Sequence, residues 1–304
     1  MQTLLLLAVF AFANLAEADP GAHGDPHFTG WDGVNFDFTG EPGQVYCMIS
    51  DELFHMNMKL CGRAKLLRSG RTKLQTWIKE LGFMYRGHRV AMAARDGADL
   101  LHKASFLSTL LVNGEDVALH REKDQFRSAD KGVLIQYDKR ESHGVMQFDL
   151  YKLVFGYKNE EVVLLVKAGP EVPEERENVC DAFVHLSVEV VGGRPDFWTG
   201  GVHGILGQTL LNARGRSRLR GDGSYKTEWN PLLVQMQVAG PNGDGYLDGN
   251  ISDYVSSGLL HSDCRFARFN PNLVVTSNLA PPLIIVSSGY SRRFLPGSFP
   301  YNAN

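Results

Sequence analysis

Apolar and polar residues alternate with a period of two through much of this chain. Phe54 to Leu60 reads F-H-M-N-M-K-L, and Val34 to Phe38 reads V-N-F-D-F. Successive residues of a strand face opposite sides of a sheet, so this alternation predicts half-buried strands. The same pattern on both sides of Arg86-Gly87-His88 predicts a hairpin over Leu74–Ala94. Further strands are expected at residues 106–112, 133–137, 145–155, 162–166, 183–191 and 232–238.

Short strands separated by turn residues favour an all-β fold. Asn113-Gly114 and Gly192-Gly193 stand between expected strands, and no stretch has the period of a long amphipathic helix. We therefore predict a mainly antiparallel β-sandwich over residues 19–270. From residue 271 onward proline, serine and asparagine are frequent, which predicts an extended C-terminal tail over residues 271–304.

Bulk composition narrows the class of protein. The chain has 304 residues, of which 43% are hydrophobic and 21% charged, and these values are typical of a globular protein. The formal net charge of -3 gives no overall attraction to nucleic acid, so no nucleic-acid partner is expected.

The first residues predict secretion. Leu4–Ala13 is apolar but shorter than the about 20 residues that cross a bilayer, and Ala16-Glu17-Ala18 follows as an A-x-A cleavage pattern. We interpret residues 1–18 as a signal peptide. No lysine or arginine precedes the apolar run, so a buried N-terminal strand or helix is the alternative. No later segment is apolar over the length of a bilayer, and no membrane insertion is expected.

In a secreted protein the cysteines are expected to form disulfides, because the compartment is oxidising. Cys47, Cys61, Cys180 and Cys264 are even in number, which in a secreted chain predicts two disulfides and no free thiol. None of them forms a C-x-x-C pair, so a structural zinc site is disfavoured. Three pairings can be drawn among four cysteines, and the sequence alone leaves the choice open.

Three stretches together resemble the von Willebrand factor type D domain. Gly24-Asp25-Pro26-His27, followed by Trp31-Asp32-Gly33, is similar to the opening of that domain, and Gly200–Thr209 (GGVHGILGQT) is similar to the Gly-rich turn near its other end. Asp253-Tyr254-Val255 with Ser257–Phe266 adds a similarity to plant proteins of the root cap and late-embryogenesis-abundant-related type. The resemblance covers nearly the whole chain after the signal peptide, and it implies a β-rich extracellular domain.

The resemblance implies two kinds of site. Some type D domains bind Ca²⁺ through the Asp of the opening motif and side chains of the late turn, which here selects Asp32 and Asn212. Because calcium takes about 6–8 oxygen ligands and the late turn lacks acidic residues, a simple turn at Asp32 is the favoured alternative. Some type D domains also cleave their own backbone. Here Asp25 would attack its own carbonyl, Pro26 would leave and His27 would donate the proton, although a structural turn is again favoured.

The resemblance also bears on assembly. Type D domains are rich in cysteine and some form disulfide-linked multimers, whereas this chain has four cysteines, so we expect a monomer. Pairing Cys47 with Cys264 and Cys61 with Cys180 would join the two ends of such a module and close long loops. We take this pairing as our prediction, with the other two still open.

Three further features of the sequence are candidate binding or modification sites. Arg214, Arg216, Arg218 and Arg220 alternate, and on an extended segment they would share one face that could contact an anionic polysaccharide; a solvated loop is the favoured alternative. Residues 242–250 (NGDGYLDGN) lack the closing Glu of an EF-hand and predict a hydrophilic turn. Asn250-Ile251-Ser252 is an N-glycosylation sequon.

No enzyme signature is found in the sequence. The histidines are dispersed, and there is no H-E-x-x-H, G-x-S-x-G or phosphate-binding loop. We expect a secreted, non-enzymatic structural or interaction protein of the plant cell wall, mucilage or other extracellular matrix. It would bind polysaccharide or matrix proteins and need no cofactor, with Ca²⁺ as the open alternative. The alternatives are a lectin-like carbohydrate-binding module and a glycoside or other hydrolase that uses Asp25, Asp32 or Asp37.

Overall fold

A computed structural model describes most of the chain between residues 20 and 272. The described residues are 20–23, 27–31, 34–66, 70, 72–95, 105–143, 146–156, 162–170, 180, 182–189, 202–209, 217–219, 225–227 and 247–272. The expected signal peptide, the expected strand at 232–238 and the tail from residue 273 onward lie outside these residues.

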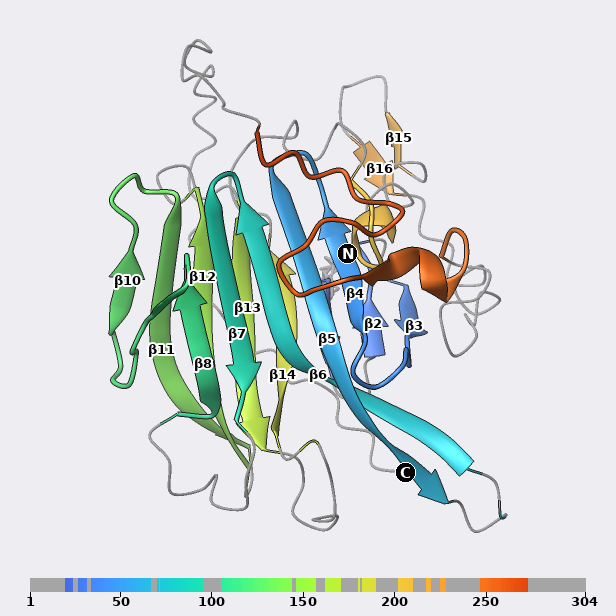
Figure 1. Cartoon of the computed structure of the whole chain (residues 1–304), viewed down its shortest axis with the longest axis horizontal. Coiled ribbons are helices and arrows are strands. Elements are labelled where there is room, and N and C mark those ends of the chain that lie inside the picture. Colours follow the sequence, from blue (N-terminus) through green and yellow to red (C-terminus); the bar gives the residue numbers. More distant parts are fainter. Residues whose placement is uncertain are drawn as a thin grey trace, which may run out of the picture. The chain divides into compact units, whose positions relative to one another are not determined.

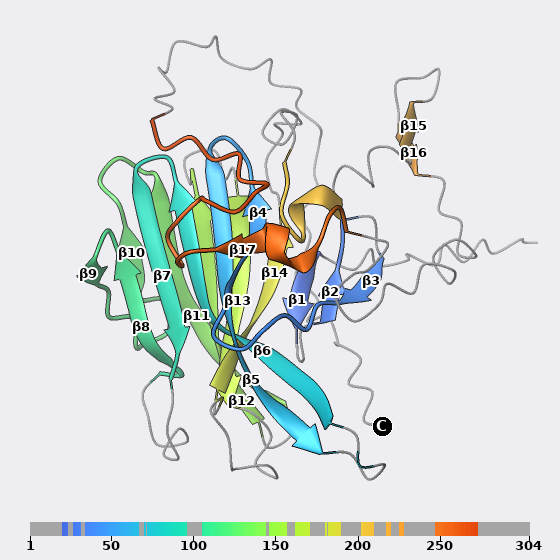
Figure 2. The same ribbon diagram turned by 45° about the vertical axis from the view of Figure 1, so that its right-hand side comes forward.

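Two antiparallel sheets pack face to face (Figure 1 and Figure 2). The eight-stranded sheet contains, in spatial order, β10 (Gln125–Arg127), β11 (Val133–His143), β12 (Met146–Phe155), β13 (Val162–Pro170), β14 (Ala182–Glu189), β1 (Gly21–His23), β2 (His27–Thr29) and β3 (Asn35–Asp37). The seven-stranded sheet contains β17 (Val255–Ser256), β4 (Val45–Ser50), β5 (Phe54–Leu66), β6 (Thr72–Tyr85), β7 (His88–Ala94), β8 (Leu107–Val112) and β9 (Glu115–Asp116). The all-β, mainly antiparallel sandwich that the alternation predicts is therefore confirmed.

Smaller elements lie outside the two sheets: a short helical turn at residues 207–209, a hairpin and a 3₁₀ turn. β15 (Ser217–Leu219) and β16 (Tyr225–Thr227) form a separate two-stranded hairpin. A single 3₁₀ turn, η3 (Ile251–Tyr254), precedes β17. No helix among the described residues is long and apolar enough to cross a membrane.

Aromatic side chains fill the space between the sheets. The ring of Phe155 on β12 lies 5.2 Å from that of Phe54 on β5, measured between centroids, and 5.7 Å from the rings of Phe83 and Tyr85 on β6. All four residues are fully buried. These are the inward positions of the alternating pattern, and truncating one such ring typically costs about 3–5 kcal/mol of unfolding free energy.

The first strand lies inside the eight-stranded sheet rather than at its edge. β1 pairs with β14, where Ala22 is opposite Leu186, and it also pairs with β2. Gly21 is required at this point, because a Cβ there would overlap the carbonyl oxygen of Leu186. The sequence predicted neither β1 nor β2, since three-residue strands are too short to show alternation.

A buried carboxylate ties the start of β8 to the other sheet. Asp149 on β12 is fully buried and accepts hydrogen bonds from the backbone N–H of Phe106 (2.7 Å), the Tyr137 hydroxyl (3.1 Å) and Arg140 Nε (2.8 Å). Burial, together with the charge of Asp149, raises the pKa of Tyr137 to about 12. The charge is fully compensated by these partners, as buried ions require, so this cluster holds the fold together.

Candidate functional site

The paired strands β5 and β6 continue past their neighbours as a two-stranded projection. Pairing of β4 with β5 ends at Lys59, and pairing of β6 with β7 begins at Glu80, whereas β5 and β6 stay paired as far as Leu66 and Thr72. Figure 1 and Figure 2 show this projection beyond the lower edge of the sandwich. We call residues 62–76 the arm; of these, 62–66, 70 and 72–76 are described.

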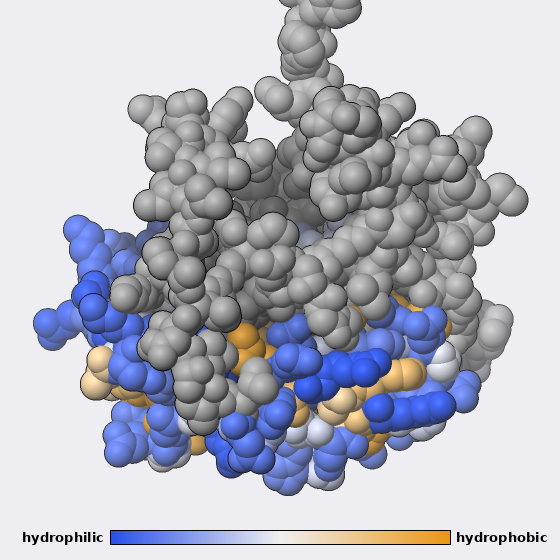
Figure 3. All heavy atoms as spheres, turned by 90° about the horizontal axis from the view of Figure 1, so that it is seen from above, coloured by the Kyte–Doolittle hydropathy of each residue, from blue (hydrophilic) through white to orange (hydrophobic). Residues whose placement is uncertain are grey.

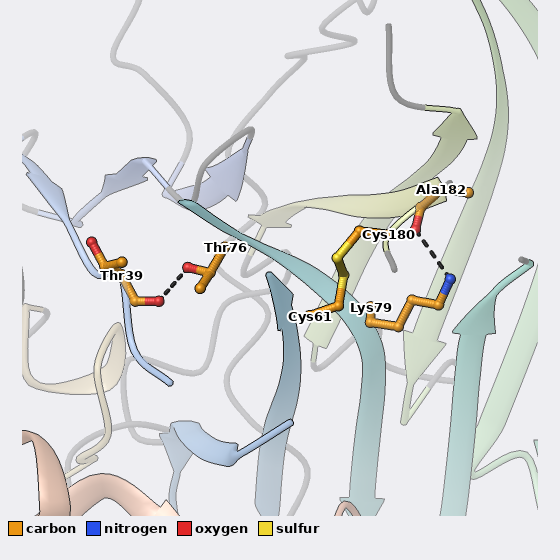
Figure 4. The surroundings of a disulfide bond; sticks show 6 residues. All are labelled: Thr39, Cys61, Thr76, Lys79, Cys180 and Ala182. Carbon is orange, nitrogen blue, oxygen red and sulfur yellow. Dashed lines mark hydrogen bonds between the residues drawn. A yellow bond between two sulfur atoms is a disulfide. The ribbon is translucent and has the colours of Figure 1, made fainter. Parts of the chain in front are cut away.

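The Cys61–Cys180 disulfide lies at the base of the arm, and its predicted pairing is confirmed. Cys61 and Trp77 are opposite each other in the β5–β6 register, and Trp77 packs with Cys180 and Phe183 in a small buried cluster of their own. The disulfide therefore fixes the arm to the segment that leads into β14 (Figure 4).

Two hydrogen bonds add to this attachment. The Thr76 hydroxyl donates to the carbonyl of Thr39, and Lys79 Nζ donates to the carbonyl of Ala182 at 3.3 Å (Figure 4). Lys79 is buried although it is a lysine. The base of the arm is thus held from three directions: β14, the disulfide and the segment before β4.

Cys47 and Cys264 correct one prediction. Both are buried free thiols in this structure, whereas the even cysteine count predicts that no thiol is free. They are nevertheless neighbours, because the two side chains are hydrogen-bonded to each other. The predicted Cys47–Cys264 disulfide is therefore not formed in this structure, although the two thiols lie next to each other.

A segment that we call the strap, residues 256–270, covers the outer face of the seven-stranded sheet (orange-red in Figure 1). Asn57 on β5 donates through Nδ2 to three strap carbonyls, those of Gly258 (3.2 Å), Leu259 (3.1 Å) and His261 (2.7 Å). Gly82 on β6 lies so close to the backbone of Leu259 that a Cβ there would overlap the Leu259 carbonyl oxygen. The strap is thus held by outward positions of the sheet, which the alternation alone would have left in solvent.

A hydroxyl, an imidazole and an amide form a row beneath the strap. His55 Nδ1 lies 2.8 Å from Ser50 Oγ, and His55 Nε2 lies 2.9 Å from Asn57 Oδ1. Burial lowers the pKa of His55 to about 4, so the ring is neutral at physiological pH. Because Asn57 Oδ1 can only accept, Nε2–H of the neutral ring donates to it, and the Ser50 hydroxyl donates to Nδ1. The backbone N–H of Arg268 in turn donates to Ser50 Oγ at 2.8 Å.

This order of groups is also that of a nucleophile, a base and an orienting residue. Here Ser50, His55 and Asn57 are each fully buried. In the strap, the backbone N–H of Arg268 donates to the Ser50 hydroxyl, and the carbonyl of His261 accepts from the Asn57 amide. A substrate could reach the Ser50 hydroxyl only after the strap had left. In the described conformation the row fastens the strap to the sheet.

The three stretches that carry the family resemblance meet in space. The backbone N–H of Trp31 donates to Thr209 Oγ1 at 2.9 Å, which joins the opening motif to the Gly-rich turn. Gln208 Nε2 donates to the Tyr254 hydroxyl at 2.7 Å, which joins that turn to the third stretch. Tyr254 in turn donates to the carbonyl of Asp248 at 2.6 Å.

The proposed self-cleavage site is described only in part. His27 opens β2, opposite Asp37 on β3, and its Nδ1 lies 2.6 Å from Asp37 Oδ1. Both side chains are more than half exposed. Asp25 and Pro26 lie outside the described residues, so the imidazole is placed but the scissile bond is not.

Some of the other predicted sites lie within the described residues, and others lie outside them. Asn250 is exposed at the start of η3, as a glycosylation acceptor requires. Arg218 lies on β15, opposite Lys226, while Arg214, Arg216 and Arg220 lie outside the described residues. The expected calcium ligands Asp32 and Asn212 also lie outside them. Within the described ranges no three His, Cys, Asp or Glu side chains are grouped to hold a metal ion.

A shallow open groove of about 370 Å³ runs beside the strap. Its polar lining consists of Lys79, Glu80, Ser108 and Thr109, and its apolar lining includes alanines 91, 93 and 94 of β7. Seen from above, the described residues form a mainly hydrophilic surface with small hydrophobic areas (Figure 3). The groove is small and open, and its lining mixes polar and apolar residues.

No protein-family model matches the chain, and no curated protein matches it.

Proposed function

We propose that this chain is a secreted, non-catalytic structural or interaction protein of the extracellular matrix or plant cell wall, with a von Willebrand type D-like domain of the root cap and late-embryogenesis-abundant-related type. The observation that carries the proposal is the buried Cys61–Cys180 disulfide, which joins residues 119 positions apart. Disulfides persist in oxidising compartments and are rare in the cytosol. The expected signal peptide and the exposed sequon at Asn250 agree with this location.

Contacts between the motif stretches support the type D-like part of the proposal. Trp31, Thr209 and Tyr254 come from stretches that are far apart in sequence, and the fold connects them through two side-chain hydrogen bonds. A chance resemblance of three separate stretches would not require them to meet.

Expression of the full chain in a secretory host tests the proposal. We expect the protein in the medium, beginning at Asp19, with a glycan on Asn250 that disappears in Asn250→Gln and with Cys61 and Cys180 in one disulfide-linked peptide. Retention inside the cell with residues 1–18 intact would contradict the extracellular role. The same chain without residues 1–18 is the matched control and should stay inside.

A lectin-like module is the second candidate, and the groove beside the strap favours it. The Thr109 hydroxyl can hydrogen-bond to sugar hydroxyls, whereas the Glu80 carboxylate already pairs with Lys59 Nζ at 2.8 Å. A glycan array separates the two roles. Saturable binding to one neutral glycan class, lost in Thr109→Val, supports the lectin, whereas weak, salt-sensitive binding to many polyanions supports the matrix role.

A further inference from the structure

The arm carries a concentrated positive charge on an acidic chain. From Leu60 to Lys79 the sequence contains six basic residues and no acidic one, although the whole chain has a net charge of -3. Three of the six, Arg63, Lys65 and Lys73, lie on the described strands of the arm. The charge of this hairpin is therefore opposite in sign to that of the rest of the protein.

The register places these basic residues together. Lys65 is directly opposite Lys73, and Arg63 is opposite Gln75. Residues two apart on a strand share one side of the pleat, so positions 63, 65, 73 and 75 form one side of the arm. Like charges directly opposite each other destabilise a sheet. A bound anion would relieve such repulsion between the opposite positions 65 and 73.

The other side of the arm differs in character. Ala64 is opposite Leu74, and Leu66 is opposite Thr72, so this side carries no charge. The basic positions consequently follow a line along one side of a ribbon only two strands wide. Such a line matches a linear polyanion better than a flat anionic surface, from which the net negative charge of the whole protein would repel it.

The base of the arm is rigid enough to present that line. A hairpin of two strands is marginally stable alone in water. Here the disulfide at Cys61, the buried ring of Trp77 and the hydrogen bond from Thr76 to Thr39 hold it before any partner arrives. Binding then requires little additional ordering of the backbone, which favours affinity.

We propose that the arm is a binding site for a linear anionic polysaccharide, with Arg63, Lys65 and Lys73 as the contacting residues. The proposal deepens the extracellular role proposed above by naming its ligand class and residues, and it takes its biological setting from that role. It differs from the sequence-based expectation, which assigned polyanion contact to the arginines at 214–220.

The test is binding of the full chain to immobilised heparin and to polygalacturonate, which carry sulfate and carboxylate groups, with dextran as the neutral control. The triple variant Arg63→Gln, Lys65→Gln, Lys73→Gln should bind about tenfold more weakly or worse, since each exposed ion pair contributes up to about 1 kcal/mol. The charge-preserving variant Lys65→Arg, Lys73→Arg should bind within about twofold of the parent. Raising salt from about 50 to 200 mM should weaken parental binding on the order of tenfold.

Matched variants keep the proposal falsifiable. Substitution of Arg214, Arg216, Arg218 and Arg220 by Gln should leave binding unchanged; loss of binding there, and not in the arm variant, would move the site and overturn the proposal. Binding of the parent to phosphatidylserine vesicles but to neither polysaccharide would also overturn it.

Charged residues on open strand edges can instead prevent aggregation. If the triple variant aggregates while its monomeric fraction binds heparin as the parent does, the charges prevent aggregation. Polysaccharide binding by these residues would then be excluded. An unchanged Cys61–Cys180 peptide and a melting temperature no lower than that of the parent establish that the variant is folded. Failure of secretion would contradict the extracellular role while leaving the binding result intact, so the two proposals fail separately.

Discussion

The Cys47 thiol on β4 is hydrogen-bonded to the Cys264 thiol in the strap. Burial raises the pKa of Cys47, and the bond donated by Cys47 lowers the pKa of Cys264. Cys264 is therefore the thiol that more readily becomes a nucleophilic thiolate, with Cys47 next to it to complete an exchange.

We expect oxidised glutathione to convert this pair into a disulfide. The Cys264 thiolate attacks one glutathione sulfur and releases glutathione; Cys47 then displaces the second glutathione and forms the Cys47–Cys264 bond. By the loop-entropy account the bond should stabilise the fold by about 2–4 kcal/mol. Peptide mapping and urea unfolding measure both effects. Mixed pairing of Cys47 or Cys264 with Cys61 or Cys180 would contradict the geometry.

Gly82→Ala should detach the strap locally. The new methyl group would overlap the backbone of Leu259, and the strap must move to accommodate it. Overpacking of this kind costs about 1–3 kcal/mol. Gly87→Ala is the matched control, because a Cβ there meets nothing within 4 Å. Urea unfolding should separate the two variants, and Cys264 should become more reactive toward iodoacetamide only in Gly82→Ala. Equal behaviour of the two variants would count against a closely packed strap.

His55 should make stability depend on pH. Its folded-state pKa of about 4 lies below the ordinary value of 6.5, so the folded protein binds fewer protons than the unfolded chain between these values. The stability from neutral His55 is therefore complete above about pH 6.5 and is lost as the pH falls toward 4, by on the order of 3 kcal/mol.

A second group opposes this trend. Burial raises the pKa of Asp51 to about 6, from 3.8, so protonation of Asp51 stabilises the fold over part of the same range. The contribution of His55 is isolated by comparing the parent with His55→Gln at about pH 7 and about pH 4.5. The parent should lose more unfolding free energy than the variant; an equal loss would show that His55 is not the sensing group.

Any cleavage of the Asp25–Pro26 bond should be slow, favoured at about pH 5–6 and mediated by His27. Protonated His27 forms an ion pair with Asp37, so Asp37→Asn should slow the release of a chain that begins with Pro26. Asp25→Ala should abolish it. N-terminal sequencing after incubation measures the product. A chain that keeps its start, or is cut equally fast in Asp25→Ala, would leave the motif a structural turn.

Sequence alternation predicted the long strands because their inward positions are uniformly apolar. The hairpin over β6 and β7 turns at Arg86 and Gly87 as expected. The extension of β5 beyond Leu60 was not predicted, since its sequence mixes basic and apolar residues without the alternation of a half-buried strand.

The packing of the strap on the sheet was not predicted, for a different reason. Ser50, His55 and Asn57 stand at outward positions, where polar residues are ordinarily interpreted as solvent-exposed. Only a segment about 200 residues away in sequence turns them into buried hydrogen-bonding groups, as the bond from Asn57 to Leu259 shows (sequence separation 202). Local pattern carries no information about such a partner. Cysteine pairing was easier to predict from the sequence, because four cysteines allow three pairings.

The position of β1 between β14 and β2 has a consequence for how the chain assembles. β1, the first strand that the structure describes, has its long-range partner in β14, which is complete only when Glu189 has been made. Strand pairing between residues so distant in sequence makes folding slow, because the chain loses the entropy of closing the loop before the new contacts stabilise it. Until then β13 and β1 both have an open edge, and a chain released before residue 182 would be prone to associate with its copies through those edges.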